Sequence, residues 1–294
     1  MNRLKALLGA DRPVLFDGGM GTLLQDSGLE DGVPGELWNL ENPEAVRAAH
    51  AAYATAGAQV LTTNSFGGTR PRLDLHGLGG RVGDVNREAA QIARSVADEH
   101  GVLVAGDLGP TGELLAPLGT LTGEEAQALF AEQLTALLAG GIDLVLVETL
   151  SDLGEADAAL AAAREVAPDL PVVVTMSFDT NLRTMMGVRP GDAVVHLAAG
   201  GADAVGANCG RGPAEMELIA AEMAQARTGD VLLITQSNAG LPQVVGDHFE
   251  YDATADDMAS HATRLAELGI DLVGGCCGST PAHVAAMRAT LNPA

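Results

Sequence analysis

The chain has 294 residues, and hydrophobic residues make up 47% of them, which is enough for a large core and excludes a mainly disordered chain. Its 16 Lys and Arg against 39 Asp and Glu give a formal charge of −23, which would repel nucleic acid and anionic membranes, so we expect neither as a partner. The only lysine is Lys5, near the N-terminus. That position disfavours Schiff-base chemistry of the aldolase or pyridoxal kind.

The sequence shows no sign of export or membrane insertion. No apolar run approaches the roughly 18 to 20 residues of a membrane span, and the first 13 residues hold too short an apolar stretch for a signal peptide. We therefore expect a cytoplasmic protein. Its cysteines are odd in number, which argues against a disulfide framework and favours reduced thiols.

A repeated pattern marks the buried strands of the chain. Each copy starts with a glycine suited to end a helix, continues through a short apolar run typical of a buried parallel strand, and ends in a polar residue or cysteine. The four copies align without gaps at 57–64, 141–148, 201–208 and 269–276. Four more strands are predicted at 14–17, 102–107, 172–177 and 231–236.

Helices are predicted between these eight strands. Their start signals are Asn42 before Pro43, a capping box at Thr122, Asp152 with Glu155, and Thr280 before a proline. The strands recur about every 37 residues and leave no segment for a second domain. The sequence therefore predicts an α/β fold, a single (β/α)₈ TIM barrel over residues 1–294. The alternative is an open doubly wound sheet, which seldom needs eight evenly spaced units.

Polar residues end every predicted strand. In a (β/α)₈ barrel the active site lies at the carboxyl ends of the strands, so these residues become the candidate site. They are Asp17, Asn64, Asp107, Glu148, Ser177, Asn208 with Cys209, 236–238, and Cys276 with Cys277.

All three cysteines fall at this rim. Cys276 takes the eighth position of the repeat, and Cys209 and Cys277 take the ninth, so the three thiols are expected at one height. Three converging sulfur ligands suit a soft or borderline ion, and Zn²⁺ is the best candidate in a reducing compartment. The competing interpretation is that they are small buried apolar residues.

The predicted metal site has an open fourth position. No fourth cysteine exists, and most of the seven histidines are expected at the surface; His283 is the nearest candidate for closing the site, but we expect a surface role for it. Three thiolates give Zn²⁺ a net charge of −1, which disfavours hydrolysis through metal hydroxide. A substrate thiol bound there would lose its proton and stay nucleophilic, so sulfur alkylation is the expected reaction.

Seven motifs resemble those of the homocysteine S-methyltransferases, with a particular similarity to the homocysteine-binding module of cobalamin-dependent methionine synthase. The match spans nearly the whole chain. The motifs are Asp-Gly-Gly-Met-Gly-Thr at 17–22, Thr-Asn-Ser-Phe-Gly at 63–67, Gly-Asp-Leu-Gly-Pro at 106–110, Glu-Thr at 148–149, Gly-Ala-Asn-Cys-Gly at 206–210, Ser-Asn-Ala-Gly at 237–240 and Gly-Gly-Cys-Cys-Gly at 274–278. The resemblance implies that Cys209, Cys276 and Cys277 hold Zn²⁺ and that homocysteine sulfur takes the fourth position.

Other residues of these motifs are candidates for holding the amino-acid end of the substrate. Gly18 and Gly19 lie in a turn that could offer backbone N–H groups to a carboxylate; the alternative is a tight glycine turn. Asp17 and Glu148 end buried strands, where a bound ammonium group would compensate their charge; the alternative is bonding to neighbouring loops.

Two asparagines complete the candidate set. Asn64 and Asn238 could orient the substrate, and the Asn238 oxygen could occupy the zinc without substrate; structural amides are the alternative.

The resulting prediction is a zinc-dependent methyltransferase that converts homocysteine to methionine. The methyl donor is S-methylmethionine, a related onium compound, or a methylated corrinoid carried by a separate protein, because the chain has no residues left for folate or corrinoid modules. The sequence Asp-Leu-His-Gly-Leu-Gly at 74–79 matches a corrinoid-binding pattern, which we interpret as coincidental. The alternative function is a non-catalytic zinc-bearing barrel that binds a thiol or a partner protein.

Overall fold

The computed structural model describes residues 3–8, 13–245 and 248–291, in which eight parallel strands form one sheet. The strand order is β1-β10-β7-β6-β5-β4-β3-β2, and a parallel bridge between Phe16 and Val60 brings the two end strands together. The sheet is therefore a nearly closed barrel, which confirms the predicted fold class. Its strands are β1 Val14–Leu15, β2 Val60–Thr62, β3 Leu103–Leu108, β4 Leu144–Leu150, β5 Val172–Met176, β6 Ala204–Cys209, β7 Leu232–Ser237 and β10 Leu272–Gly275.

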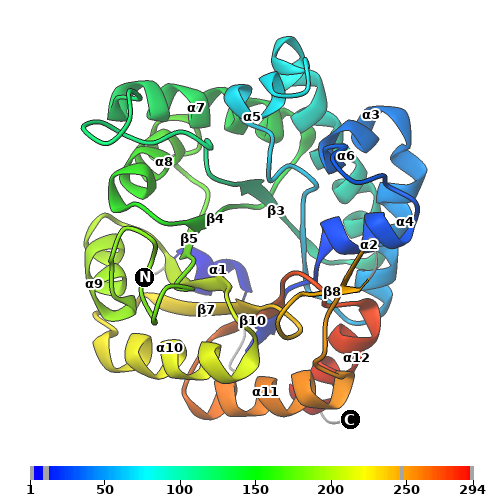
Figure 1. Ribbon diagram of the computed structural model, residues 1–294, viewed down its shortest axis with the longest axis vertical. Helices are drawn as coiled ribbons and strands as arrows, with labels where there is room; N and C mark the ends of the chain where they lie inside the picture. The colour runs from blue at the N-terminus through cyan, green and yellow to red at the C-terminus, as the bar shows by residue number, and fades with distance from the viewer. Residues whose placement is uncertain (1–2, 9–12, 246–247, 292–294) are drawn as a thin grey trace.

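Helices surround this barrel as an outer ring, whereas the N-terminal helix α1 lies inside that ring in the view of Figure 1. Each connection between consecutive barrel strands contains at least one helix, as right-handed βαβ crossovers require. The helices are α1 Arg3–Leu8, α2 Met20–Asp26, α3 Trp38–Glu41, α4 Pro43–Thr55, α5 Arg70–Asp74, α6 Val82–His100, α7 Gly123–Gly140, α8 Leu153–Val166, α9 Pro190–Ala199, α10 Pro213–Ala226, α11 Ala255–Glu267 and α12 Pro281–Leu291. Short 3₁₀ helices cover Gly35–Leu37 and Gly79–Arg81.

The apolar core has two layers. The larger layer lies between the strands and the ring of helices and is rich in alanine, which allows close helix–sheet packing. The smaller layer fills the barrel interior with one or two side chains from each strand, such as Phe16 and Ile234. Leu4 of α1 is fully buried against this inner layer. The interior is thus a packed core, and the site described below lies where this core ends.

The helix start signals are largely confirmed, with one difference. Thr122 and Glu125 form the expected capping box, and α4 and α12 begin at the expected prolines. Asp152 also caps α8, by accepting a hydrogen bond from Gly154 N. Glu155, however, accepts hydrogen bonds from the backbone and hydroxyl of Thr111, 44 residues away in sequence. Glu155 therefore binds Thr111 instead of the backbone at the start of α8.

Two features of the chain were not predicted. An antiparallel hairpin, β8 Gln243–Val245 with β9 His248–Glu250, follows barrel strand β7. Two histidines, His50 in α4 and His261 in α11, are fully buried rather than exposed. None of the helices in the described ranges combines the length and apolarity needed for a membrane span.

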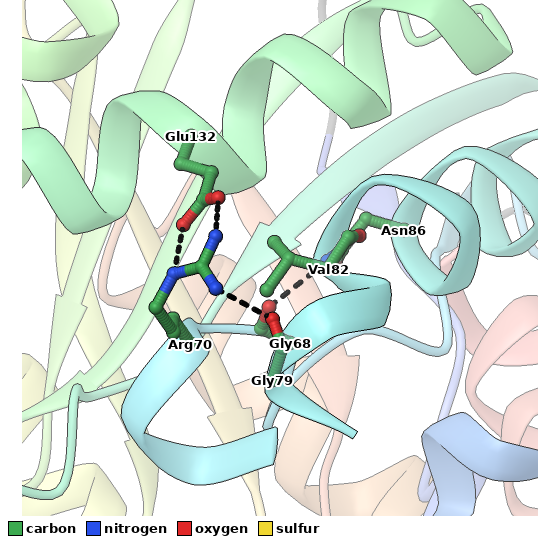
Figure 2. A network of polar contacts seen from close by, with 6 residues as sticks. All are labelled: Gly68, Arg70, Gly79, Val82, Asn86 and Glu132. Atoms are coloured by element: carbon green, nitrogen blue, oxygen red, sulfur yellow. Dashed lines mark hydrogen bonds and ion pairs between the residues drawn. The ribbon is translucent and has the colours of Figure 1, made fainter. Parts of the chain in front are cut away.

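The segment between β2 and α6 is fastened to its neighbours by polar contacts (Figure 2). The Arg70 guanidinium forms a two-pronged ion pair with Glu132 of α7 and donates to Gly79 O at 2.8 Å. The Asn86 amide donates to Gly68 O at 2.9 Å, and a Cβ at Gly68 would lie only 2.2 Å from the Asn86 oxygen. This close approach requires glycine and fixes one wall of the site described below.

Candidate metal centre

The site arises where the inward-facing side chains of the barrel change from apolar to polar. On β4, Leu144 and Leu146 are buried in the barrel interior, and Glu148 is the next residue on that face. The same alternation leads from Ala105 to Asp107 on β3. Because strand side chains alternate with a period of two, each polar residue points along the barrel axis above the core.

A cavity of about 460 Å³ opens above this polar layer. Most of the predicted site residues line it: Asp17, Gly18, Gly19, Asn64, Glu148, Cys209, Cys276 and Cys277. Asn238 belongs to the adjoining loop, where its backbone N–H donates to Cys209 O at 3.3 Å. The structure therefore brings the cysteines and the candidate substrate-binding residues to one place.

The three thiols converge as the repeat predicts. The sulfurs of Cys209 and Cys276 are 3.1 Å apart, and all three sulfurs lie within 4.8 Å of one another. In the part of the chain that the structure describes, this is the one cluster of three or more metal-ligating His, Cys, Asp or Glu residues. His283 is not part of it, because its ring nitrogens contact Thr280 and Ala253 O.

Backbone hydrogen bonds between three loops hold the cysteines together. Cys276 N donates to Ser237 O at 2.8 Å, and Ala239 N donates to Cys277 O at 3.0 Å. The loop after β7 therefore lies between the cysteine of β6 and the pair after β10. The thiols come from residues 67 positions apart in sequence, but their backbones share one hydrogen-bonded framework.

The thiol cluster favours one thiolate. Hydrogen bonds from Cys209 and Cys276 lower the pKa of Cys277 to about 3, and the Tyr251 hydroxyl contributes in the same direction. Hydrogen bonds to its two neighbours raise the pKa of Cys276. The thiols of Cys209 and Cys276 thus both donate toward the Cys277 sulfur. A metal ion that replaces these thiol protons would meet three sulfur ligands already close together.

Buried carboxyl groups also line the cavity. Burial raises the pKa of Asp17 to about 7, although its two oxygens accept hydrogen bonds from Thr62 N at 2.7 Å and Thr62 Oγ1 at 2.8 Å. Burial, followed by the charges of Cys277 and Asp17, raises the pKa of Glu148 to about 8. Both groups would gain from a cation bound between them.

Asp107 is a further carboxyl group of this wall, to which the sequence analysis gave no role. It is 2% exposed, and its Oδ1 has no hydrogen-bond partner in the structure. Burial raises its pKa well above the usual range, and the charges of Glu148, Glu36 and Asp17 act in the same direction. Its place at the end of β3 was visible in the sequence, but its missing partner was not.

Gly18 and Gly19 allow the first loop to touch the cysteine loop. A Cβ at Gly18 would lie 2.6 Å from Ser279 O, and one at Gly19 would lie 2.7 Å from Cys276 O. The Gly19 N–H donates to Ser279 O at 3.0 Å, so this N–H group already has a partner within the protein. The glycines are therefore needed for close backbone contact beside the cysteines.

The two candidate asparagines have different surroundings. The Asn64 amide nitrogen donates to Gly35 O at 2.8 Å and to Asn39 Oδ1 at 3.0 Å, so both of its protons are used within the protein. The Asn238 nitrogen donates to Gly210 O at 2.9 Å, whereas its buried Oδ1 has no hydrogen-bond partner in the structure. The free oxygen of Asn238 is therefore the more available of the two for a ligand.

Asn208 links the carboxylate wall to the metal ligands. Its Oδ1 accepts hydrogen bonds from Thr149 N at 2.9 Å and Thr175 Oγ1 at 2.8 Å, and its Nδ2 donates to Thr149 Oγ1 at 2.6 Å. These bonds hold Thr149 at φ 62°, and the adjacent Cys209 has φ 60°. A positive φ is unfavourable for residues other than glycine. We call the hydrogen bonds of Asn208 to Thr149 and Thr175 the Asn208 clamp, and they fix Glu148 relative to Cys209.

A family model described as homocysteine S-methyltransferase matches residues 14–291, which is nearly the whole chain. The chain belongs to this family. Two methionine synthases, from Mycobacterium leprae and Mycobacterium tuberculosis, are each 34% identical over 298 residues that cover 96% of this chain. The chain spans about a quarter of the length of these curated relatives, 24% and 25% respectively.

A solved structure supports the same relationship over full length. The metallated form of the homocysteine methyltransferase MmuM from Escherichia coli superimposes with a TM-score of 0.81 at 27% identity. The match covers 98% of this chain and 99% of that one. Family membership and fold thus agree with the resemblance carried by the sequence motifs.

Proposed function

We propose that this chain transfers a methyl group to the thiol of homocysteine and releases methionine, with Zn²⁺ held by Cys209, Cys276 and Cys277. The observation that carries the proposal is the convergence of three cysteine sulfurs at one wall of a cavity lined by buried carboxyl groups. Family membership supports the same reaction. We also propose that residues 1–294 act as one functional domain.

The donor set fits Zn²⁺. A tetrahedral zinc with Zn–S bonds of about 2.3 Å separates its sulfurs by about 3.8 Å. Here the Cys209 and Cys276 sulfurs are 3.1 Å apart and all three sulfurs lie within 4.8 Å of one another, so small side-chain shifts would bring them to that value. When bound, Zn²⁺ would lower the pKa of the substrate thiol so that homocysteine reacts as a thiolate.

The other candidate residues would bind different groups of the homocysteine molecule. Glu148 and Asp17 carry the charge that would pair with the substrate ammonium group, which in turn would offset the cost of burying them. Gly18 and Gly19 shape the loop beside the cysteines for the substrate carboxylate. Asn64 lines the cavity and would orient the substrate, and the Asn238 oxygen is available for the metal before homocysteine arrives.

The methyl group comes from an onium compound such as S-methylmethionine or from a methylated corrinoid on a separate protein. In either case the homocysteine sulfur forms the new S–CH₃ bond while the donor keeps the electron pair of the bond that breaks. The thiol proton leaves to solvent when homocysteine binds. The chain's own residues position the two reactants and exclude water from the sulfur.

A donor panel tests the proposal. Zinc-loaded protein is incubated with homocysteine and, separately, S-methylmethionine, another methyl sulfonium compound, and methylcobalamin, and methionine is measured. We expect methionine with at least one donor and none after Cys276→Ala. Homocysteine ligation without methionine from any donor would instead favour a non-catalytic zinc-bearing barrel.

A further inference from the structure

Arg72 is the one arginine or lysine among the described residues that line the site cavity. It lies in α5 and is half-buried. Within the described ranges its guanidinium has neither a hydrogen bond nor an ion pair. The chain has 39 Asp and Glu against 16 Lys and Arg, and arginines such as Arg70 and Arg94 do pair with carboxylates. The unpaired guanidinium of Arg72 is therefore available to an anionic group of a ligand.

The Arg72 side chain has a defined place. A Cβ added at Gly112 would lie 2.9 Å from Arg72 Cδ and 3.7 Å from its Nη1, so the side chain packs over the loop after β3. That loop is anchored by Glu155, which accepts hydrogen bonds from Thr111 N at 2.9 Å and Thr111 Oγ1 at 2.6 Å. The contacts of Arg70 fasten α5 itself (Figure 2). Two fixed elements therefore hold the guanidinium at the cavity.

Glu36 offers a carboxyl group to the same cavity, from the short 3₁₀ helix that begins at Gly35. Its Oε1 accepts a hydrogen bond from Gly67 N, whereas no described residue donates to its Oε2. The 3₁₀ helix is tied to the end of β2, because Asn64 Nδ2 donates to Gly35 O at 2.8 Å. Glu36 is 8% exposed. It thus keeps one oxygen for a ligand and lies against the connection that carries Arg72.

Glu36 and Arg72 do not pair with each other, although both line the cavity. A ligand that lies between them must carry a cationic group for Glu36 and an anionic group for Arg72. An α-amino acid presents an ammonium and a carboxylate group on one carbon and meets both requirements. Both residues belong to helical segments that follow the strands, whereas Glu148 lies within β4. The pair is therefore distinct from the strand residues assigned to homocysteine.

We propose that Glu36 and Arg72 bind the amino-acid end of the methyl donor, and that this donor is a sulfonium derivative of an α-amino acid. The inference rests on the proposed function and deepens it, because it selects one class of donor. The donor's ammonium pairs with Glu36 and its carboxylate with Arg72, which leaves the sulfonium group unpaired and directed to the homocysteine sulfur. That sulfur forms a bond to the methyl carbon as the bond from this carbon to the sulfonium sulfur breaks. The sulfonium sulfur keeps the electron pair and leaves as a neutral thioether.

Steady-state kinetics of zinc-loaded wild type, Arg72→Gln and Glu36→Gln test this assignment, with S-methylmethionine as the donor and methionine as the measured product. Each substitution removes one charge-assisted hydrogen bond made in both the ground state and the transition state. We therefore expect KM for S-methylmethionine to rise roughly 10- to 150-fold in each variant, with kcat nearly unchanged. Glutamine at 36 keeps an oxygen that can accept from Gly67 N. An unchanged KM in either variant would overturn the inference.

Arg81→Gln is the matched control, because Arg81 is an exposed arginine of the same connection and is not among the residues that line the cavity. It should leave KM for S-methylmethionine unchanged. Homocysteine binding, measured by titration calorimetry without a donor, should be equal in Arg72→Gln and wild type. Weaker homocysteine binding in Arg72→Gln would place Arg72 on the carboxylate of homocysteine and would overturn its role toward the donor.

A measurement on wild type covers variants that do not fold. Trimethylsulfonium has the same reacting group as S-methylmethionine but no amino-acid end, so kcat/KM should be at least about 100-fold higher for S-methylmethionine. Equal values would contradict the inference. If wild type makes methionine with methylcobalamin but not with S-methylmethionine, the inference fails and the proposed function stands. If wild type makes methionine with no donor, the proposed function fails instead.

Discussion

Replacing Glu148 by glutamine removes an ionisable carboxyl group from the cavity while keeping the shape of the side chain. Glu148 lies on the same inward-facing row as Leu144 and Leu146 and lines the cavity with the three cysteines. Its carboxylate is placed to meet the ammonium group of a substrate whose sulfur reaches the metal. Loss of one charge-assisted hydrogen bond costs about 1.5 to 3 kcal/mol, so Glu148→Gln should weaken homocysteine binding roughly 10- to 150-fold.

Titration calorimetry of zinc-loaded protein measures this effect. 4-Mercaptobutanoate, which has the same chain but no amino group, should bind wild type and Glu148→Gln almost equally. Asp107→Asn is the matched control, because Asp107 is a second buried carboxyl group of the same wall. Normal homocysteine binding by Glu148→Gln, or loss of its zinc, would refute the assignment and shift the ammonium site to Asp17 or Asp107.

Two further substitutions test how the barrel supports the site. His50 is fully buried with neither ring nitrogen hydrogen-bonded, and burial lowers its pKa to about 4. Because the unfolded histidine takes up its proton below about pH 6.5, this group should remove about 2 kcal/mol of stability between pH 7 and pH 5. In urea unfolding, the free energy of unfolding of His50→Leu should fall by about 2 kcal/mol less than that of wild type between pH 7 and pH 5. An equal fall in both proteins would contradict this role of His50. Asn208→Ala leaves the partners at Thr149 and Thr175 unpaired and should lower the unfolding free energy by about 2 to 5 kcal/mol and weaken zinc binding. A loss below about 1 kcal/mol would show that the clamp is dispensable.

The barrel could be predicted because its signals are local and repeated. A glycine before the apolar run and a polar residue or cysteine after it recur in four aligned copies, four further apolar runs lie between them, and all eight strands form where expected. The convergence of the thiols followed from the same repeat, since equivalent positions of parallel strands lie at one height. The 3.1 Å between the sulfurs of Cys209 and Cys276, with all three sulfurs within 4.8 Å of one another, agrees with that reasoning.

The partners of individual side chains could not be predicted in the same way. Glu155 follows a helix start at cap spacing, yet it binds Thr111 because the fold brings a buried loop to it. The Asn64 amide donates to Gly35 and Asn39, which lie in a 3₁₀ helix and a four-residue helix too short to show a periodic pattern in the sequence. The position of Tyr251 was missed for a similar reason, since two three-residue strands precede it and nothing local indicates that its ring packs against Gly278.

Zinc-edge X-ray absorption with and without homocysteine tests the central claim most directly. The account predicts one zinc per chain, three sulfur ligands in the free protein and four after homocysteine is added. Binding near pH 7 should also release close to one proton more than binding of an analogue of the same length without the thiol, because the thiol enters as a thiolate. The account would be contradicted if the zinc–sulfur coordination number did not change on adding homocysteine. It would also be contradicted if any two of the three single Cys→Ala variants kept their full zinc content.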